Sequence, residues 1–464
     1  MKINNIQTQK LLIYFLFVHI FLWTIIPSII NNNLHLDTIE VLAWGNELQL
    51  GYDKYPPVFP LFTELFFKVF GNQDWAYYLL SQLFVASSFI IIFQFAKHFF
   101  ENKIHCLFSV LLLETIYFFN YTTPELNAFL CQFPFLSLSA LYCWRAINKN
   151  KNFDWFMFGF FAGIATLTYY LSLYLLASIS IFFIFEIIKN KKFNNKYFLT
   201  LIVYLITLSP HLYWIFNDNF TSIEYALFRS FGDPLSEINN FKYSANITYP
   251  FIFLMKQLLI LVPFFLMLST ILNRLKITIN FKDKKLIFLF SITILPIILM
   301  FFTSLFGGVR IRTMWMTTFY LFPGIFFLYL FKSNITFEKY KKIIIVFLLF
   351  FLITPLSYGI DSFIQKDKRT DFPGKQIAKT IQLEWNKNFS NSIDIVSGKS
   401  WVYGGWYAGN LSYQLKNRPK LKYSVNENLE NGRILIDVLD KITSCKGVIV
   451  KVKPYYEACM IGKK

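Results

Sequence analysis

The sequence predicts a polytopic α-helical membrane protein with a small α/β domain at its C-terminal end. Hydrophobic residues make up 55% of the 464 positions, and 57 of the residues are Phe. The mean hydropathy is +0.45, which exceeds what a soluble core normally requires. Apolar runs recur up to residue 359, whereas the remaining residues have the mixed composition of a soluble fold. We therefore expect a transmembrane catalytic domain in residues 1–359 and a separate domain in residues 360–464.

A helix needs about 20 mostly apolar residues to cross a bilayer. The sequence contains about 11 such segments, with boundaries good to a few residues. The first is interpreted as a retained helix, because no small-x-small cleavage site follows it before Asn31. The fifth and sixth are separated by a single plausible turn at residues 169–172, so one long tilted helix is the alternative. The predicted spans are 11–30, 76–96, 104–120, 126–146, 155–170, 172–188, 198–216, 250–272, 286–304, 314–331 and 343–359.

Lys and Arg residues are unequally divided between the two sides of these spans. Cytoplasmic loops are enriched in both residue types, so the richer side, which includes the N-terminus, is predicted to be cytoplasmic. The net charge of +18 then reflects topology, and nucleic acid is not an expected partner. Loops 31–75 and 217–249 face outward. The short outward loops contain few basic residues, namely Lys54, Lys68, Arg229, Lys242, Arg310 and Arg312.

With this topology, the domain in residues 360–464 also lies on the outer side. Oxidising conditions there permit a disulfide between Cys445 and Cys459, with two free thiols as the alternative. Hydrophobic periodicity predicts strands at 393–397 and 448–452, and helices at 375–385 and 407–415.

The first outward loop begins with two acids at helical spacing. Asp37 and Glu40 are three residues apart, so on a helix they would share one face. Ionisable residues at membrane depth are costly and usually functional. The alternative is that both are ordinary interfacial acids.

A lysine on a stiff segment follows in the same loop. Pro56 and Pro57 fix their own φ angles and keep the preceding residue out of helix, so Lys54 and Tyr55 are expected on extended backbone. A lysine held in this way is a point charge suited to a phosphate. The alternative is a lysine that snorkels to the membrane interface.

This loop resembles the first outward loop of membrane glycosyltransferases of the GT-C fold. The similar group contains the bacterial 4-amino-4-deoxy-L-arabinose lipid A transferases and the dolichyl-phosphate-mannose protein mannosyltransferases. The loop contains Asp37-x-x-Glu40 and then Gly-Tyr-Asp-Lys-Tyr-Pro-Pro at 51–57. Tyr55 stands where many relatives have His, which argues against a metal-ligand role for this position. Further blocks that match the family in order are 119–127, 209–220 with 225–229, 310–315 with 322–324, and 395–401 with 408–413 and 418–419.

The resemblance implies an inverting transfer of a sugar from a polyprenyl (undecaprenyl) phosphate to a lipid A-type or other envelope acceptor. The reaction would occur on the outer face of the bacterial inner membrane, with the N-terminus cytoplasmic and the C-terminal domain periplasmic. A protein O-glycosyltransferase of the same fold is one alternative. From other classes, a lipid or sugar transporter or flippase and a non-enzymatic scaffold are alternatives, although the hydropathy shows no repeat of the kind that transporters have.

The resemblance and the chemistry of the reaction together suggest the site residues. A leaving phosphate requires preorganised positive groups, and a neutral acceptor hydroxyl requires a base. For His211 a structural hydrogen-bonding role is the alternative, and for Asn127 a helix cap. The expected residues are Asp37 and Glu40 for catalysis, Lys54, Arg310, Arg312 and Arg229 for the donor phosphate, and Tyr52, Tyr55, Glu125, Asn127 and His211 for substrate binding.

No cofactor and no metal is required by this interpretation. A divalent cation held by the oxygens of Asp37 and Glu125 is the alternative. The expected partners are a polyprenyl phosphate sugar donor, a glycolipid (lipid A-like) or protein acceptor, and membrane lipids.

Overall fold

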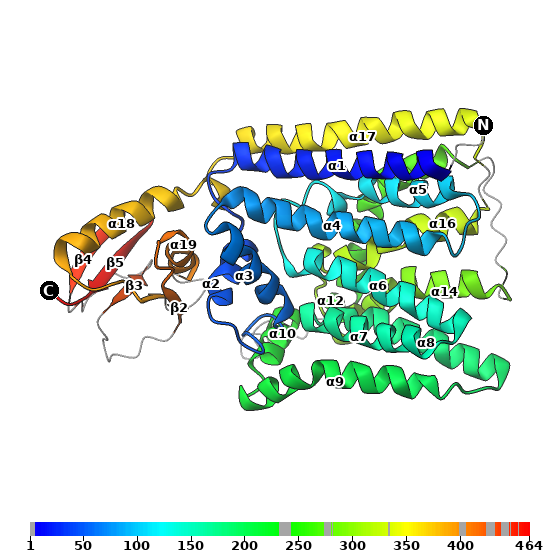
Figure 1. Cartoon of the computed structure of the whole chain (residues 1–464), viewed down its shortest axis with the longest axis horizontal. Helices are drawn as coiled ribbons and strands as arrows, with labels where there is room; N and C mark the ends of the chain where they lie inside the picture. The colour runs from blue at the N-terminus through cyan, green and yellow to red at the C-terminus, as the bar shows by residue number, and fades with distance from the viewer. Residues whose placement is uncertain are drawn as a thin grey trace.

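The computed structural model consists of a long bundle of helices with a small α/β domain at one end (Figure 1). The N-terminus lies at the opposite end of the bundle (Figure 1). The structure describes residues 5–231, 243–272, 280, 282–332, 335–398, 405–423, 432–437, 445, 447–452 and 454–464.

The helical bundle is built from long apolar helices and shorter helices that bend or connect them. Four segments form short 3-10 helices, at Leu113–Thr115, Tyr117–Phe119, Thr313–Leu321 and Arg369–Asp371. In chain order, the α-helices are α1 (Asn5–Ile30), α2 (Leu36–Gly45), α3 (Val58–Phe70), α4 (Asp74–Ala96), α5 (Lys103–Leu111), α6 (Ala128–Lys149), α7 (Asn152–Thr168), α8 (Ser172–Asn190), α9 (Lys196–Asn217), α10 (Thr221–Phe231), α12 (Tyr243–Ile260), α13 (Val262–Ser269), α14 (Lys284–Thr293), α15 (Leu295–Gly307), α16 (Pro323–Leu330) and α17 (Phe337–Ile364).

Among the described residues, five helices are long and apolar enough to cross a membrane, namely α1, α4, α8, α9 and α17. Three pairs of consecutive helices, each bent at a short break, would bring the number to eight if each pair forms one span. These pairs are α12 with α13, α14 with α15, and the 3-10 helix Thr313–Leu321 with α16. The three other predicted spans coincide with α5, α6 and α7, which are not among these candidates. A polytopic helical membrane protein is thus confirmed, whereas the predicted number of 11 spans is not.

Proline explains the bent pairs. The bends measure 44°, 41° and 58°, and the second helix of each pair has a Pro in its first turn, at Pro263, Pro296 and Pro323. A Pro at this position lacks the N–H that would continue the preceding helix, and its ring clashes with the previous turn. Hydropathy alone does not reveal such breaks.

The predicted span 104–120 is wrong as a continuous helix. Helix α5 ends at Leu111, and two short 3-10 helices follow. The Asn120 side chain donates to the carbonyl oxygen of Glu114 and accepts from the Tyr121 backbone N–H. These side-chain bonds compete with the helical backbone pattern and turn the chain. The predicted turn at 169–172 does separate α7 from α8, so the alternative of one long tilted helix is not observed.

In its described residues, the C-terminal domain consists of a mixed sheet and the two α-helices α18 and α19. The predicted boundary after residue 359 falls inside α17, which continues to Ile364. Strand order is β2-β1-β3-β5-β4, with β1 parallel to β2 and β3, and β5 antiparallel to β3 and β4. A disulfide joins Cys445 to Cys459, which is one of the two alternatives that the sequence left open. The elements are α18 (Gly374–Asn388), β1 (Ile395–Gly398), α19 (Gly405–Gln414), β2 (Lys420–Lys422), β3 (Arg433–Asp437), β4 (Val448–Val452) and β5 (Tyr456–Ile461).

Arg418 joins this domain to the short helices α2 and α3. Its guanidinium group donates to Glu64 Oε2 at 2.6 Å and to the carbonyl oxygen of Leu42 at 2.7 Å. It also lies 3.6 Å from the ring centroid of Phe67. Because Leu42 belongs to α2 and Glu64 to α3, one side chain fixes both helices to the domain.

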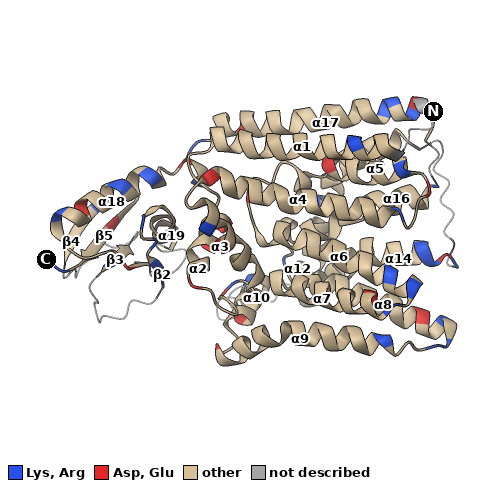
Figure 2. Ribbon diagram, viewed as in Figure 1, with Lys and Arg blue, Asp and Glu red and all other residues tan. Residues whose placement is uncertain are grey.

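The charged residues of the bundle are unequally distributed along its length. Figure 2 shows Lys and Arg gathered at the end that carries the N-terminus, away from the C-terminal domain. Helices α2, α3 and α10 lie at the other end, next to this domain (Figure 1). The outward loops predicted at 31–75 and 217–249 contain these three helices, and residues 232–242 lie outside the described part of the chain.

Candidate active site

Helix α2 carries both predicted catalytic acids and meets the predicted lysine. Asp37 lies in its first turn and Glu40 one turn later, on the same face. The Lys54 ammonium donates to Asp37 Oδ1 at 3.0 Å and to Glu40 Oε2 at 2.6 Å. The exposed fractions of the side chains are 16% for Lys54, 20% for Asp37 and 4% for Glu40. The three groups therefore form a largely buried cluster of two acids and one base.

Hydrogen bonds within the loop hold Lys54 in place. The backbone N–H of Tyr52 donates to the carbonyl oxygen of Tyr55 at 3.0 Å, which closes a tight turn around the lysine. The Tyr52 hydroxyl donates to the carbonyl oxygen of Glu47 and accepts from the backbone N–H of Gln49. The Tyr55 ring is buried. The Tyr52 hydroxyl is thus hydrogen-bonded within the loop. Lys54 Nζ lies over the Tyr55 ring, 4.8 Å from its centroid.

A glycine and a histidine join this loop to α9. A Cβ atom at Gly51 would lie 2.2 Å from the Trp214 ring, so the loop can approach α9 only with Gly here. His211 Nδ1 lies 2.7 Å from the carbonyl oxygen of Leu50, and Nε2 lies 2.7 Å from the Tyr170 hydroxyl. Because a carbonyl accepts, Nδ1 carries the proton and Nε2 accepts from Tyr170. Both ring nitrogens are occupied, which corresponds to the structural alternative for His211.

The segment after α5 brings Glu125 to the N-terminus of α2. The backbone N–H of Asp37, one of the N–H groups that a helix start leaves unpaired, acts on the Glu125 carboxyl and lowers its pKa, against the larger effect of burial. The Thr38 hydroxyl donates to the carbonyl oxygen of Leu126 at 3.1 Å. Asn127 caps α6, where its Oδ1 accepts from two backbone N–H groups. The cap alternative for Asn127 is therefore observed, and Glu125 lies next to the acids.

Burial and neighbouring charges shift the pKa values of two acids of the site, Glu40 and Glu125, toward neutral pH. Burial raises the pKa of Glu40 from its ordinary value of 4.5 to about 7, against the opposing charge of Lys54. Burial and then the charge of Asp37 raise the pKa of Glu125 to about 7. Burial disfavours the charged form of Lys54, but Tyr55, Asp37 and Glu40 outweigh it and hold the pKa of Lys54 well above 10.5. Lys54 is therefore a cation at neutral pH.

Three arginines lie around this cluster. The charge of Arg229, on α10, acts on Glu40. Burial and then the charge of Arg229 lower the pKa of Arg312, with a smaller contribution from Arg310. Such interactions between charges are screened beyond about 10 Å. Within the described part of the chain, none of the three guanidinium groups forms a salt bridge.

Several residues near the site were missed by the sequence analysis. The Tyr169 ring lies 5.9 Å from that of Tyr55, and Tyr225 lies one turn before Arg229, within reach of the Lys54 charge. Tyr423 of the C-terminal domain accepts from Trp44 Nε1 at 3.1 Å. Only Tyr225 stood in a matched block of the sequence. The other two are brought in by tertiary packing, which leaves no local signal.

The acids of this site are also the residues that could hold a divalent cation. In the described ranges, no group of three or more His, Cys, Asp or Glu side chains is arranged to hold an ion. The Lys54 ammonium already contacts both acids of α2. The positive charge next to these acids is thus supplied by the protein itself.

The titration of Glu125 predicts how the stability of the protein depends on pH. The folded pKa of Glu125, about 7, lies above its ordinary value of 4.5. The folded state therefore binds more protons between these values, and the free energy of unfolding falls as the pH rises through this range. From about pH 5 to about pH 8, the melting temperature of the wild type should fall by about 2–4 °C more than that of Glu125→Gln.

Differential scanning fluorimetry in detergent measures both melting temperatures. Glu47→Gln is the matched control, because Glu47 pairs with Lys420 near the surface and should leave the pH dependence of the wild type unchanged. Equal falls in the wild type and in Glu125→Gln would contradict the raised pKa.

The fold and this site define a membrane protein of the GT-C type. Residues 54–214 match the family model of dolichyl-phosphate-mannose-protein mannosyltransferase. This stretch begins at Lys54 and ends at Trp214. It includes Lys54, Glu125 and His211, whereas Asp37, Glu40 and the three arginines lie outside it. The resemblance predicted from the sequence is confirmed on this part of the chain.

Seven chains of known structure match this chain. One of them is ArnT from Cupriavidus metallidurans in the apo state, with 12% sequence identity and a TM-score of 0.51 over 97% of each chain. None of the curated proteins matches the sequence. The fold is therefore shared with ArnT over nearly the full length of both chains.

Proposed function

We propose that the protein is an inverting glycosyltransferase that takes its sugar from a polyprenyl (undecaprenyl) phosphate. The observation that carries the proposal is the buried cluster of Asp37, Glu40 and Lys54, on which the charge of Arg229 also acts. Such a cluster offers a base and preorganised cations in a partly dry site, which is what the departure of a phosphate requires. The family match over 54–214 and the shared fold support the same class of reaction.

In the proposed reaction, an acceptor oxygen attacks the anomeric carbon on the face opposite the phosphate. The bond between this carbon and the phosphate oxygen breaks, and polyprenyl phosphate leaves with both electrons. Asp37 accepts the proton of a hydroxyl acceptor, whereas a phosphate acceptor is already ionised and needs no base. Arg229, Arg310 and Arg312 receive the negative charge of the leaving phosphate. No cofactor is needed, because these cations belong to the chain.

Lys54 has two tasks in this proposal. Its ammonium has three N–H groups, of which two are donated to Asp37 and Glu40. The third is left for the donor phosphate. Lys54 thus keeps the two acids close together and adds one positive contact to the three arginines.

The proposed acceptor is a lipid A-type glycolipid or another envelope molecule at the outer face of the bacterial inner membrane. The enrichment of Lys and Arg at the opposite end of the bundle supports a cytoplasmic N-terminus and a periplasmic C-terminal domain (Figure 2). A protein acceptor is the second candidate, because the matching family model is that of a protein mannosyltransferase.

The test uses the purified protein in liposomes with labelled sugar on a polyprenyl phosphate, and lipid A or an envelope protein as the acceptor. We expect the label to appear on one acceptor class, with release of polyprenyl phosphate. Mass spectrometry of lipid A and envelope glycans from a deletion strain identifies the sugar and the acceptor together. Movement of the donor across the bilayer without transfer would instead indicate a flippase and contradict the proposal.

The arginines predict a specific change in donor binding. Arg310→Gln and Arg312→Gln should each raise the KM for the donor by about 10-fold, because one charge-assisted hydrogen bond to phosphate contributes about 1.5–3 kcal/mol. The KM for the acceptor should change little. Initial rates at varied donor concentration measure this effect.

Lys68→Gln is the matched control for these two variants. Lys68 is an exposed cation at the end of α3 on the same side of the molecule, and removing it should leave the KM for the donor unchanged. An equal rise of the KM in all three variants would indicate a general loss of surface charge and contradict a phosphate site at the arginines.

A further inference from the structure

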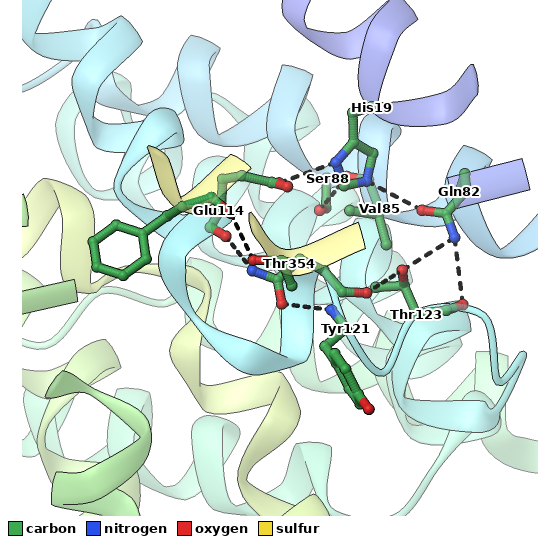
Figure 3. A network of polar contacts seen from close by, with 10 residues as sticks. His19, Gln82, Val85, Ser88, Glu114, Tyr121, Thr123 and Thr354 are labelled. Carbon is green, nitrogen blue, oxygen red and sulfur yellow. Dashed lines mark hydrogen bonds and ion pairs between the residues drawn. The ribbon is translucent and has the colours of Figure 1, made fainter. Parts of the chain in front are cut away.

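A polar network crosses the interior of the helical bundle behind the site. His19 on α1, Gln82 on α4, Glu114 and Thr123 are each at most 2% exposed. Figure 3 shows their side chains converging from three segments of the chain. His19 Nδ1 lies 3.0 Å from Glu114 Oε2, and His19 Nε2 lies 3.1 Å from Gln82 Oε1. None of these residues takes part in the proposed chemistry.

The orientation of the Gln82 amide follows from its neighbours. Gln82 Nε2 lies 3.1 Å from the Thr123 hydroxyl oxygen and 3.4 Å from the Thr123 carbonyl oxygen. The Thr123 hydroxyl already donates to the carbonyl oxygen of Asn120 at 2.6 Å, so it can only accept from Gln82. The amide must therefore direct its NH₂ group toward Thr123 and its oxygen toward His19.

This orientation fixes one proton on the histidine. Because Gln82 presents an acceptor, His19 Nε2 carries a hydrogen and donates it. On the other side of the ring, Glu114 Oε2 faces Nδ1 at 3.0 Å. A chain of directed contacts thus runs from Glu114 through His19 and Gln82 to Thr123.

The end of this chain lies two residues before Glu125. Thr123 is also held by the Ser81 hydroxyl, which donates to its carbonyl oxygen at 2.5 Å. Further along, the carbonyl oxygen of Leu126 accepts from the Thr38 hydroxyl of α2, which places Glu125, the residue before it, next to the start of α2. The segment 120–127 is thus anchored to the bundle at Thr123 and to α2 at Leu126.

We propose that His19, Gln82 and Glu114 are positioning residues, which set the location of Glu125 opposite Asp37 by holding Thr123. This inference rests on the proposed function. His19 lies on α1, which leads directly into α2, so the network connects both segments that carry the acids. Gln82 is its central member, because it alone bridges His19 and Thr123.

Gln82→Glu isolates the link to Thr123. A carboxylate keeps the acceptor for His19 and the size of the side chain, but it has no N–H to donate to the Thr123 carbonyl oxygen. We expect kcat to fall by about 10- to 100-fold, as for a small displacement of a reacting group, with the KM for the donor nearly unchanged. In Glu114→Gln, the amide can donate to His19 Nδ1, so kcat should stay within about 5-fold of wild type.

Gln257→Glu is the matched control. Gln257 is 3% exposed, and its Oε1 accepts from the Tyr320 hydroxyl at 2.7 Å, while its Nε2 has no hydrogen-bond partner. The same substitution therefore removes no donated bond there, and activity should persist. Equal losses in Gln82→Glu and Gln257→Glu, or a loss above about 10-fold in Glu114→Gln, would overturn the proposal.

Hydrogen–deuterium exchange gives a readout that does not depend on activity. Gln82→Glu should raise exchange in peptides that cover 118–127, whereas Gln257→Glu should not. Unchanged exchange in this segment would overturn the positioning role even if the enzyme is active. Faster exchange in a protein whose wild type transfers no sugar would support the positioning role and reject only the proposed function.

Discussion

Replacing Asp37 by Asn is expected to lower kcat by about 10³-fold with a hydroxyl acceptor, because removing a general base typically costs about 10²–10⁴-fold. The amide keeps the shape of the side chain, and the backbone N–H of residue 37 still acts on Glu125. The KM for the donor should change by less than about 3-fold, because the phosphate is assigned to other groups. Transfer from a labelled polyprenyl phosphate sugar, followed at varied donor and acceptor concentrations, separates the two constants.

Asp53 provides the matched control for Asp37. It lies in the same outward loop directly before Lys54, and its side chain is exposed. Asp53→Asn removes one negative charge from this loop but no contact with Lys54, so kcat should stay within about 5-fold of wild type. A loss below about 10-fold in Asp37→Asn, or similar losses in both variants, would contradict the assignment of Asp37 as the base.

Replacing Arg418 by Ala is expected to lower the free energy of unfolding by about 3–5 kcal/mol, the cost of leaving one member of a buried ion pair alone. Arg418 and Glu64 are 10% and 7% exposed and lie 2.6 Å apart. The substitution also leaves the Leu42 carbonyl oxygen without its donor. Chemical unfolding in detergent measures the change, and limited proteolysis reports release of the C-terminal domain from α2 and α3.

Lys420 forms a second ion pair across the same interface and serves as the control. Its ammonium lies 2.5 Å from Glu47 but is 54% exposed. Lys420→Ala should cost at most about 1 kcal/mol, as exposed pairs do. A double variant, Glu64→Gln with Arg418→Met, should regain part of the stability, because no charge is then left buried. If Arg418→Ala and Lys420→Ala cost the same, the buried pair is not the main anchor.

The features of the site that are close together in sequence could be predicted from it. Asp37, Glu40 and Lys54 lie within one loop, and helical spacing together with the proline pair was enough to predict that they act together. The neighbourhood of Arg229 and Arg312 followed from the outward topology. The roles given to these residues stay predictions, since the comparisons with known proteins do not test them.

Contacts between distant segments could not be predicted. Glu64 and Arg418 are 354 positions apart, and neither stands in a pattern that identifies the other. The same holds for Tyr423 and for the network of His19 and Gln82, whose partners are set by the packing of whole helices. Buried polar pairs of this kind depend on tertiary geometry, on which a single sequence gives no periodic signal.

Local chemistry also limited the prediction of the spans. Hydropathy identified segment 104–120 as apolar, but the side-chain bonds of Asn120 turn the chain there. Pro263, Pro296 and Pro323 break three further segments. A count based on apolar length therefore describes the composition of the bundle better than the course of its backbone.

The contact of Arg418 with α2 determines when, during synthesis, the site can be completed. Helix α2 is made early, yet its contacts at Leu42 and Trp44 are with Arg418 and Tyr423, which leave the ribosome hundreds of residues later. The same holds for Asn33, just before α2, which contacts Asn410. The acids on α2 thus reach their final geometry only after the tail has been made and has folded. An incomplete chain, which lacks these C-terminal contacts, would therefore be inactive in the proposed sugar transfer.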